Sequence, residues 1–118
     1  MEIAYRFAFD AAHRIEHFPE EHPNRRLHGH SFQVEVALEG DRGPEGFVVD
    51  FARIESECGA VRAALDHRLL NEIEGLDVPT LENISVWIWN SLRSALPQLA
   101  RVTVRRDSCG QSCTYGGR

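Results

Sequence analysis

The sequence predicts one α+β domain, in which an antiparallel sheet of four strands packs against two helices. Two segments in which apolar and polar residues alternate, as in strands, open the chain. Two segments with apolar residues at helical spacing follow, and a further alternating segment lies near the C-terminus. Clustered strands with segregated helices are typical of the α+β class. The 118 residues fit one domain, residues 1–118, and leave no room for a second.

The first two strands are predicted by the alternation of apolar and polar residues. Apolar side chains occupy the odd positions from Ile3 to Phe9 and the even positions from Phe32 to Leu38. A period of two is typical of a strand with one buried face. The segment between them, from Arg14 to Leu27, is rich in Glu, His, Pro and Arg and is expected to be a loop.

Two helices are predicted in the middle of the chain, after the turn-forming segment Gly40–Gly46. The first has its apolar residues at helical spacing: Ile54, Cys58, Val61 and Leu65. Thr80 is suited to cap the second, and Pro97 is expected to end it. The residues expected to point inward from this helix are Ile84, Trp87, Ile88 and Leu92.

The last two strands are expected around Val102–Val104 and Thr114–Tyr115, joined by a turn. The edges of such an open sheet need covering, and oligomerisation is one way to cover them. The chain's three cysteines are too few for a disulfide framework. Cys109 and Cys113 could bind metal, but no second pair would complete a thiolate site, so both are expected to be reduced.

Composition and charge exclude several classes of function. Thirteen basic and eighteen acidic residues give a net charge of −5, which argues against a nucleic-acid partner. No apolar run approaches the roughly 20 residues that cross a membrane. The N-terminal residues lack the basic and apolar regions of a signal peptide, so a cytoplasmic protein is expected.

Three histidines are predicted to converge. His28 and His30 are two residues apart, so in a strand they project from the same face, and they share the register of the apolar residues that follow. His13 shares the register of the first strand's apolar face. If the two strands pair antiparallel, the three imidazoles meet at one end of that face. His17 and His22, in the connecting loop, are the alternatives for the third position.

Three imidazoles with one open position are the arrangement of a catalytic zinc. Zinc is favoured over other metals because imidazole suits it and no thiolate is near in the sequence. The histidine pattern therefore predicts a Zn²⁺ site.

Five short segments occur together in the order and approximate spacing of a known enzyme family: Phe9–Arg14, Leu27–Phe32, Val49–Phe51, Leu65–His67 and Pro79–Asn83. With them the chain resembles the 6-pyruvoyl- and 6-carboxy-tetrahydropterin synthases from about Tyr5 to Gly116, and more closely the 6-carboxy branch. The resemblance implies the tunnelling fold, a four-stranded antiparallel sheet with two helices on one face. It also implies a homo-oligomer, in which three sheets close into a barrel and two trimers form a hexamer.

The resemblance further implies a reaction and its residues. The chain would be a zinc-dependent lyase that converts 7,8-dihydroneopterin triphosphate to 6-carboxy-tetrahydropterin, in queuosine and other deazapurine synthesis. His13, His28 and His30 match the zinc ligands, and the metal would act as a Lewis acid on the side-chain hydroxyls. Asp66 and His67 match the proton relay. Taken without the other motifs, that pair would be an ordinary helix C-terminus.

Three more positions match the pterin pocket of the family: Thr80, Glu82 and Asp107. A carboxylate at Asp107 would accept two parallel N–H bonds from the pterin edge, where the family has the longer glutamate. Asp107 is alternatively a polar strand-end residue, and Thr80 alternatively only a cap.

Asn24 departs from the family pattern, because it stands where the synthases have a catalytic cysteine. An amide is not a base near neutral pH. Three interpretations follow. In the first, His22, His67 or water activated by the metal takes the proton and the chain remains a synthase. In the second, the pterin side chain is cleaved as by an aldolase, as in family members with a carboxylate at this position; Asn24 supplies no carboxylate, although Glu20 and Glu21 lie close by. In the third, zinc and a pterin are bound without turnover.

Overall fold

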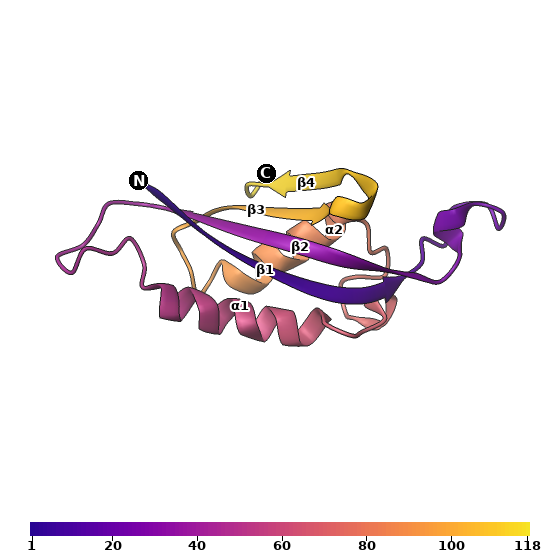
Figure 1. Ribbon diagram of the computed structural model, residues 1–118, viewed down its shortest axis with the longest axis horizontal. Helices are drawn as coiled ribbons and strands as arrows, with labels where there is room; N and C mark the ends of the chain where they lie inside the picture. Colours follow the sequence, from indigo (N-terminus) through magenta and orange to yellow (C-terminus); the bar gives the residue numbers. More distant parts are fainter.

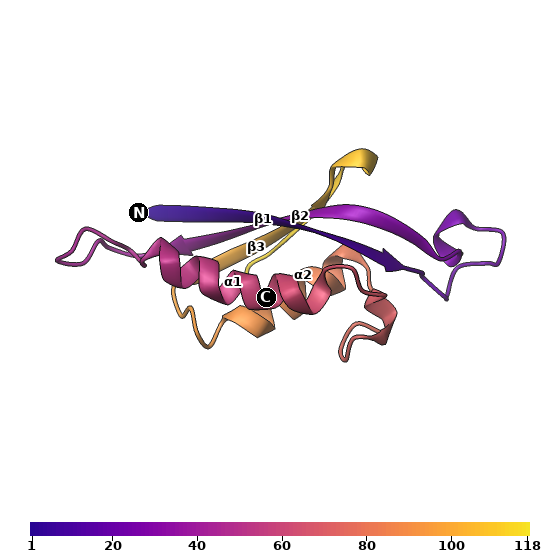
Figure 2. The same ribbon diagram turned by 60° about the horizontal axis from the view of Figure 1, so that its bottom comes forward.

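The computed structural model describes residues 1–118, and its element order confirms the predicted class. One antiparallel sheet has the strand order β1-β2-β3-β4, with β1 at Glu2–His13, β2 at His28–Glu39, β3 at Leu99–Arg106 and β4 at Gln111–Tyr115. The helices are α1 at Phe51–Leu65 and α2 at Leu81–Leu92. Both lie on the same face of the sheet (Figures 1 and 2). Single 3-10 turns occupy Pro23–Arg25, Leu70–Glu72 and Asp107–Cys109.

β1 and β2 form a long two-stranded ribbon that sets the shape of the molecule. They pair over their full length, from Glu2 opposite Glu39 to His13 opposite His28. The molecule therefore measures 57 × 23 × 22 Å, with the loop 14–27 at one end of the long axis and the loop 40–50 at the other (Figure 1). The odd positions of β1 face the same side as the even positions of β2, as the sequence predicts.

The helices begin and bury residues largely as predicted. The side chains of Asp50 and Thr80 accept backbone N–H bonds at 2.9 and 3.1 Å and cap α1 and α2. The predicted inner face of α1 is fully confirmed, with Ile54, Cys58, Val61 and Leu65 buried. The prediction for Trp87 is wrong in part, because this side chain is only half-buried and its Nε1–H donates to the Glu74 carbonyl.

The end of α2 also differs from the prediction. The helix ends at Leu92, before Pro97, and a turn carries the chain into β3. All three cysteines are free, as expected. Neither helix is long and apolar enough to cross a membrane.

The edge of β1 nearest the predicted site is covered by the segment that follows α1. His67 donates its N–H to the Asp10 carbonyl at 2.7 Å, and Ala12 donates to the Arg68 carbonyl at 3.0 Å. This short parallel contact reaches Leu69 opposite Ala12. The segment 67–69 is thereby fixed beside the last residues of β1.

Candidate functional site

Three imidazoles converge where β1 ends and β2 begins. The possible ligand atoms of His13, His28 and His30 all lie within 4.8 Å of one another. His13 Nε2 is 3.0 Å from His28 Nε2. The three side chains meet because His13 pairs with His28 in the register of the ribbon, and His30 is the next residue of β2 on the same face.

Backbone carbonyls orient two of these rings through the Nδ1 atoms, which point away from the centre of the cluster. His13 Nδ1 lies 2.9 Å from the Pro79 carbonyl oxygen, and His28 Nδ1 lies 2.6 Å from the Arg26 carbonyl oxygen. A carbonyl only accepts, so both Nδ1 atoms carry the proton in the neutral rings and both Nε2 atoms present lone pairs. Two lone pairs facing each other at 3.0 Å repel unless a cation lies between them.

This donor set fits zinc. Ligating histidines typically donate their second ring N–H to a carbonyl or carboxylate, which orients the ring and fixes the tautomer. Three imidazoles leave a fourth tetrahedral position for a ligand. His13 is fully buried and His28 and His30 are half-buried, so the open side of the cluster faces solvent through the latter two.

Burial favours the neutral form of two of the imidazoles, those of His13 and His30. It lowers the pKa of His13 to about 4, against the opposing effect of the Pro79 hydrogen bond. It also lowers the pKa of His30, with a further contribution from the charge of Arg106. Neutral imidazole is the form that binds metal.

The metal-free protein is expected to lose stability as the pH falls from about 6.5 to about 4. In this range the unfolded chain takes up a proton at His13, whose ordinary pKa is 6.5, whereas the folded chain does not. The shift corresponds to about 3 kcal/mol of unfolding free energy from this residue. The free energy of unfolding is measured by urea unfolding of chelator-treated protein at several pH values. A His13→Gln variant should lack this part of the pH dependence; equal profiles would contradict the prediction.

Asn24 lies beside the imidazoles, as its position in the sequence predicts. A cavity of about 380 Å³ is lined by Pro23, Asn24, Arg26, Leu27, His28 and His30. Asn24 is held through its backbone, which donates to His22 Nδ1 at 3.1 Å and accepts from the Ile15 N–H at 2.8 Å. Its amide side chain has no partner within the chain and is available to a ligand in this cavity.

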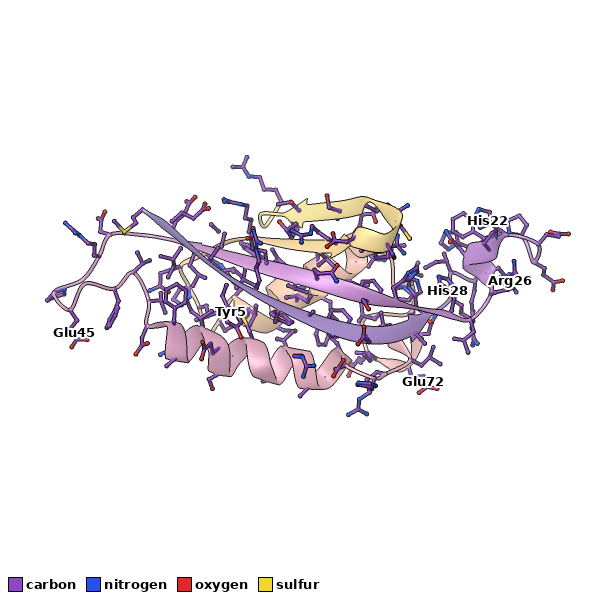
Figure 3. The ribbon with its side chains drawn as sticks, in the orientation of Figure 1. Tyr5, His22, Arg26, His28, Glu45 and Glu72 are labelled. Carbon is purple, nitrogen blue, oxygen red and sulfur yellow. The ribbon has the colours of Figure 1, made fainter.

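The two alternative metal ligands do not join the cluster. His17 stacks on Phe18, and Phe18 stacks on His22 with 4.1 Å between ring centroids. The Nδ1 of His22 is occupied by the Asn24 N–H. Figure 3 shows His28 at the end of the sheet, next to the loop that carries His22 and Arg26. Of the three candidates for the third ligand position, the structure brings only His13 next to His28 and His30.

Asp66 and His67 form a second group with Asp10. Asp66 accepts the Asp10 N–H at 2.9 Å, which lowers the pKa of its carboxyl, and it pairs with Arg62 at 3.2 Å. His67 Nε2 lies 3.7 Å from Asp66 Oδ2, and its side chain is 80% exposed. His67 has a φ of 58°, a left-handed conformation that is uncommon outside glycine.

The predicted relay pair and the imidazole cluster form two separate groups at the same end of the ribbon. A cavity of about 580 Å³ is lined by Asp10, Ala11, Ala12, Gly29, His30, Ser31, His67, Arg68 and Leu69. Asp10 and Ser31, which hydrogen-bond at 2.5 Å, alternate with the residues that carry the imidazoles and so point to the other side of the sheet. His67 lines the same cavity as His30 but does not belong to the group formed by the three imidazoles.

The three positions matched to a pterin pocket are dispersed. Thr80 caps α2, and its neighbour Pro79 orients His13. Glu82 is exposed in the first turn of α2. The Asp107 carboxylate accepts two hydrogen bonds from Arg105, at 3.1 and 3.3 Å. The role predicted for Asp107 would require it to exchange Arg105 for a ligand.

Arg106 is a residue near the cluster that the sequence analysis missed. Its positive charge adds to the effect of burial in lowering the pKa of both His13 and His30. Its register could have revealed it, because it continues the buried even positions Val102 and Val104 of β3.

Comparison with known proteins identifies the family. The family model described as 6-pyruvoyl tetrahydropterin synthase matches residues 2–118. The chain belongs to this family. The structure of the 6-pyruvoyl tetrahydropterin synthase of Caenorhabditis elegans superposes with a TM-score of 0.88 at 27% identity, over 100% of this chain and 96% of that one. The fold is thus the tunnelling fold of the synthase family.

Relatives within the synthase family carry different names. A protein of Pyrococcus furiosus named dihydroneopterin monophosphate aldolase is 44% identical over 97% of this chain and 92% of its own length. A protein of Synechocystis named 6-carboxy-5,6,7,8-tetrahydropterin synthase is 40% identical over 98% and 93%. Pterin chemistry is common to both names, and the reaction differs between them.

Proposed function

We propose that this chain is a zinc-dependent enzyme that cleaves the side chain of a dihydroneopterin phosphate in an aldolase-type reaction. The observation that carries this proposal is Asn24, an amide beside the imidazoles where a synthase needs a thiolate base. None of the three cysteines lines the cavity at the cluster. The 44%-identical relative named as an aldolase supports the same reaction.

The proposed cleavage breaks the bond between C1′ and C2′ of the side chain. A base takes the proton of the 2′-hydroxyl, and C2′ becomes the carbonyl of glycolaldehyde phosphate. The bonding pair forms a C1′=C6 double bond as the C6=N5 pair moves onto N5. A proton then adds to C1′ and gives 6-hydroxymethyl-7,8-dihydropterin. The reaction transfers one proton and needs no oxidant or reductant.

His13 and His28 would hold the zinc through their Nε2 atoms, and His30 through one of its ring nitrogens. Bound there, zinc supplies Lewis-acid chemistry that favours loss of a hydroxyl proton. The carbonyls of Pro79 and Arg26 keep the rings oriented before substrate arrives. A neutral, preoriented set of imidazoles requires little rearrangement on metal binding.

His67 is the proposed carrier of the proton, with Asp66 orienting it. Since this pair does not belong to the imidazole group of its own chain, it would act on the cluster of a second copy of the chain. The outer edge of β4 and most of the outer edge of β1 are unpaired and could join such copies. A trimer or hexamer, as the family resemblance implies, would complete the site in this way.

A second candidate function is the synthase reaction that gives 6-carboxy-tetrahydropterin for queuosine synthesis. The 40%-identical Synechocystis relative favours it. Under this reaction another residue, such as His22 or His67, would have to replace the thiolate.

Product analysis separates the candidates. Zinc-loaded protein incubated with dihydroneopterin monophosphate, and separately with the triphosphate, is expected to release 6-hydroxymethyl-7,8-dihydropterin, identified by mass spectrometry. Formation of 6-carboxy-tetrahydropterin or 6-pyruvoyl-tetrahydropterin would contradict the proposal. Tight pterin binding without any product would identify a binding protein instead.

An Asn24→Cys variant is expected to keep the cleavage rate within about tenfold of the parent, because an amide does not serve as the base in cleavage. The rate of each product is measured by quenched-flow chromatography. Asn24→Ser, which matches cysteine in size and lacks its acidic thiol, is the control. A gain of about 10²-fold or more in 6-carboxy-tetrahydropterin with Cys but not Ser would show a synthase that lacks only its base.

A further inference from the structure

Arg106, the last residue of β3, lies on the sheet face that carries the imidazoles. The preceding residue in the same register, Val104, is buried in the core. Arg106 continues this face one step beyond the last pair of β2 and β3, beside Phe32. The ring of Phe32 lies 5.6 Å from that of His30 and 5.8 Å from that of His13. The register therefore places Arg106 on the imidazole-bearing face, on the side of β3.

The charge of Arg106 has no partner within the chain. Every other arginine pairs with a carboxylate, donates to a backbone carbonyl or is exposed to solvent. Arg106 is half-buried, no carboxylate lies within ion-pair distance, and its Nε is buried without a hydrogen-bond partner. Buried donors and charges normally have partners, because leaving one unpaired is unfavourable.

The surroundings of Arg106 would favour an anion over a neutral acceptor once a cation is bound nearby. A divalent cation held by the three imidazoles would add to the positive charge already present. An anion in contact with both the guanidinium and the metal would relieve the repulsion between them. A phosphate suits the guanidinium, since its oxygens accept two parallel N–H bonds.

We propose that Arg106 binds the phosphate group of the substrate next to the metal centre. This assignment rests on the proposed function, in which the substrate is a phosphate ester of dihydroneopterin. In that substrate the phosphate oxygen is attached to C3′, one carbon beyond the 2′-hydroxyl. Arg106 thus selects phosphorylated over unphosphorylated dihydroneopterin and places the side chain at the metal.

The test compares the zinc-loaded parent with Arg106→Gln by isothermal titration calorimetry. The probes are inorganic phosphate, dihydroneopterin monophosphate and unphosphorylated dihydroneopterin. Arg106→Gln is expected to raise the Kd of both phosphorus-containing probes at least about tenfold and that of dihydroneopterin less than about threefold. Arg101→Gln is the matched control, because Arg101 belongs to the same strand but pairs with Glu2 at its other end; it should leave all three values unchanged.

Arg106→Lys is the second variant, in case the glutamine variant folds poorly. Lysine keeps the positive charge but lacks the bidentate guanidinium. The Kd for inorganic phosphate is therefore expected to lie between those of the parent and of Arg106→Gln. An equal loss for phosphorylated and unphosphorylated pterin, or no phosphate binding by the parent, would overturn the assignment. Phosphate binding that depends on Arg106 in a protein that binds neither pterin would uphold Arg106 as a phosphate-binding residue but refute the pterin substrate and with it the proposed reaction.

Discussion

His13→Ala is expected to abolish zinc binding and catalysis together. His13 is fully buried at the centre of the cluster, and its Nε2 faces that of His28. Loss of a residue that merely orients a ligand typically lowers metal affinity 10–100-fold, so loss of a ligand should exceed about 10²-fold. Elemental analysis after dialysis against a competing chelator measures the zinc, and product formation measures catalysis.

His17→Ala is the matched control, because His17 is an exposed histidine of the neighbouring loop. It should retain parental zinc content and activity. His28→Ala provides a second test at a less buried position, where a collapsed fold is a smaller concern. Undiminished zinc in folded His13→Ala or His28→Ala protein would refute the metal centre and the reaction that depends on it.

His67→Ala is expected to lower the cleavage rate by about 10²–10⁴-fold and leave zinc content unchanged. The imidazole is the only titratable ring in its cavity other than His30, and the adjacent Asp66 carboxylate is positioned to orient it. Single-turnover kinetics separate this loss of rate from a change in substrate affinity. Arg68→Ala, next in the chain and lining the same cavity, is the control, because arginine does not exchange a proton near neutral pH.

Mixing the two inactive variants tests whether the site forms between copies. If His67 of one chain serves the cluster of another, co-refolded His13→Ala and His67→Ala chains should contain some complete sites and regain activity. Activity that stays absent in mixed, assembled protein would place both functions within one chain.

The convergence of the histidines could be predicted from the sequence because strand periodicity is local. Once β1 and β2 are paired strands, the alternation of their side chains assigns His13, His28 and His30 to one face of the sheet. The same reasoning predicted the inner face of α1, whose residues recur at helical spacing. The caps at Asp50 and Thr80 are likewise local, formed within three residues of the chain.

Contacts between distant segments could not be predicted in the same way. The bond from His13 to the Pro79 carbonyl joins residues far apart in sequence, and nothing local to either indicates it. The separation of His67 from the cluster depends on which side of β1 the chain passes after α1, a property of the packing. The alternation of side chains along β3 could have placed Arg106 on this face. That its Nε lacks a hydrogen-bond partner is known only once the neighbouring side chains are placed.

The backbone at His67 sets stability against the role proposed for its side chain. A φ of 58° forces the Cβ of an L-residue toward the neighbouring carbonyl, which disfavours the conformation by roughly 1–2 kcal/mol. Glycine would adopt it freely. A chain selected for thermal stability alone would therefore have glycine at position 67. Replacing His67 to stabilise the protein would remove the proposed proton carrier.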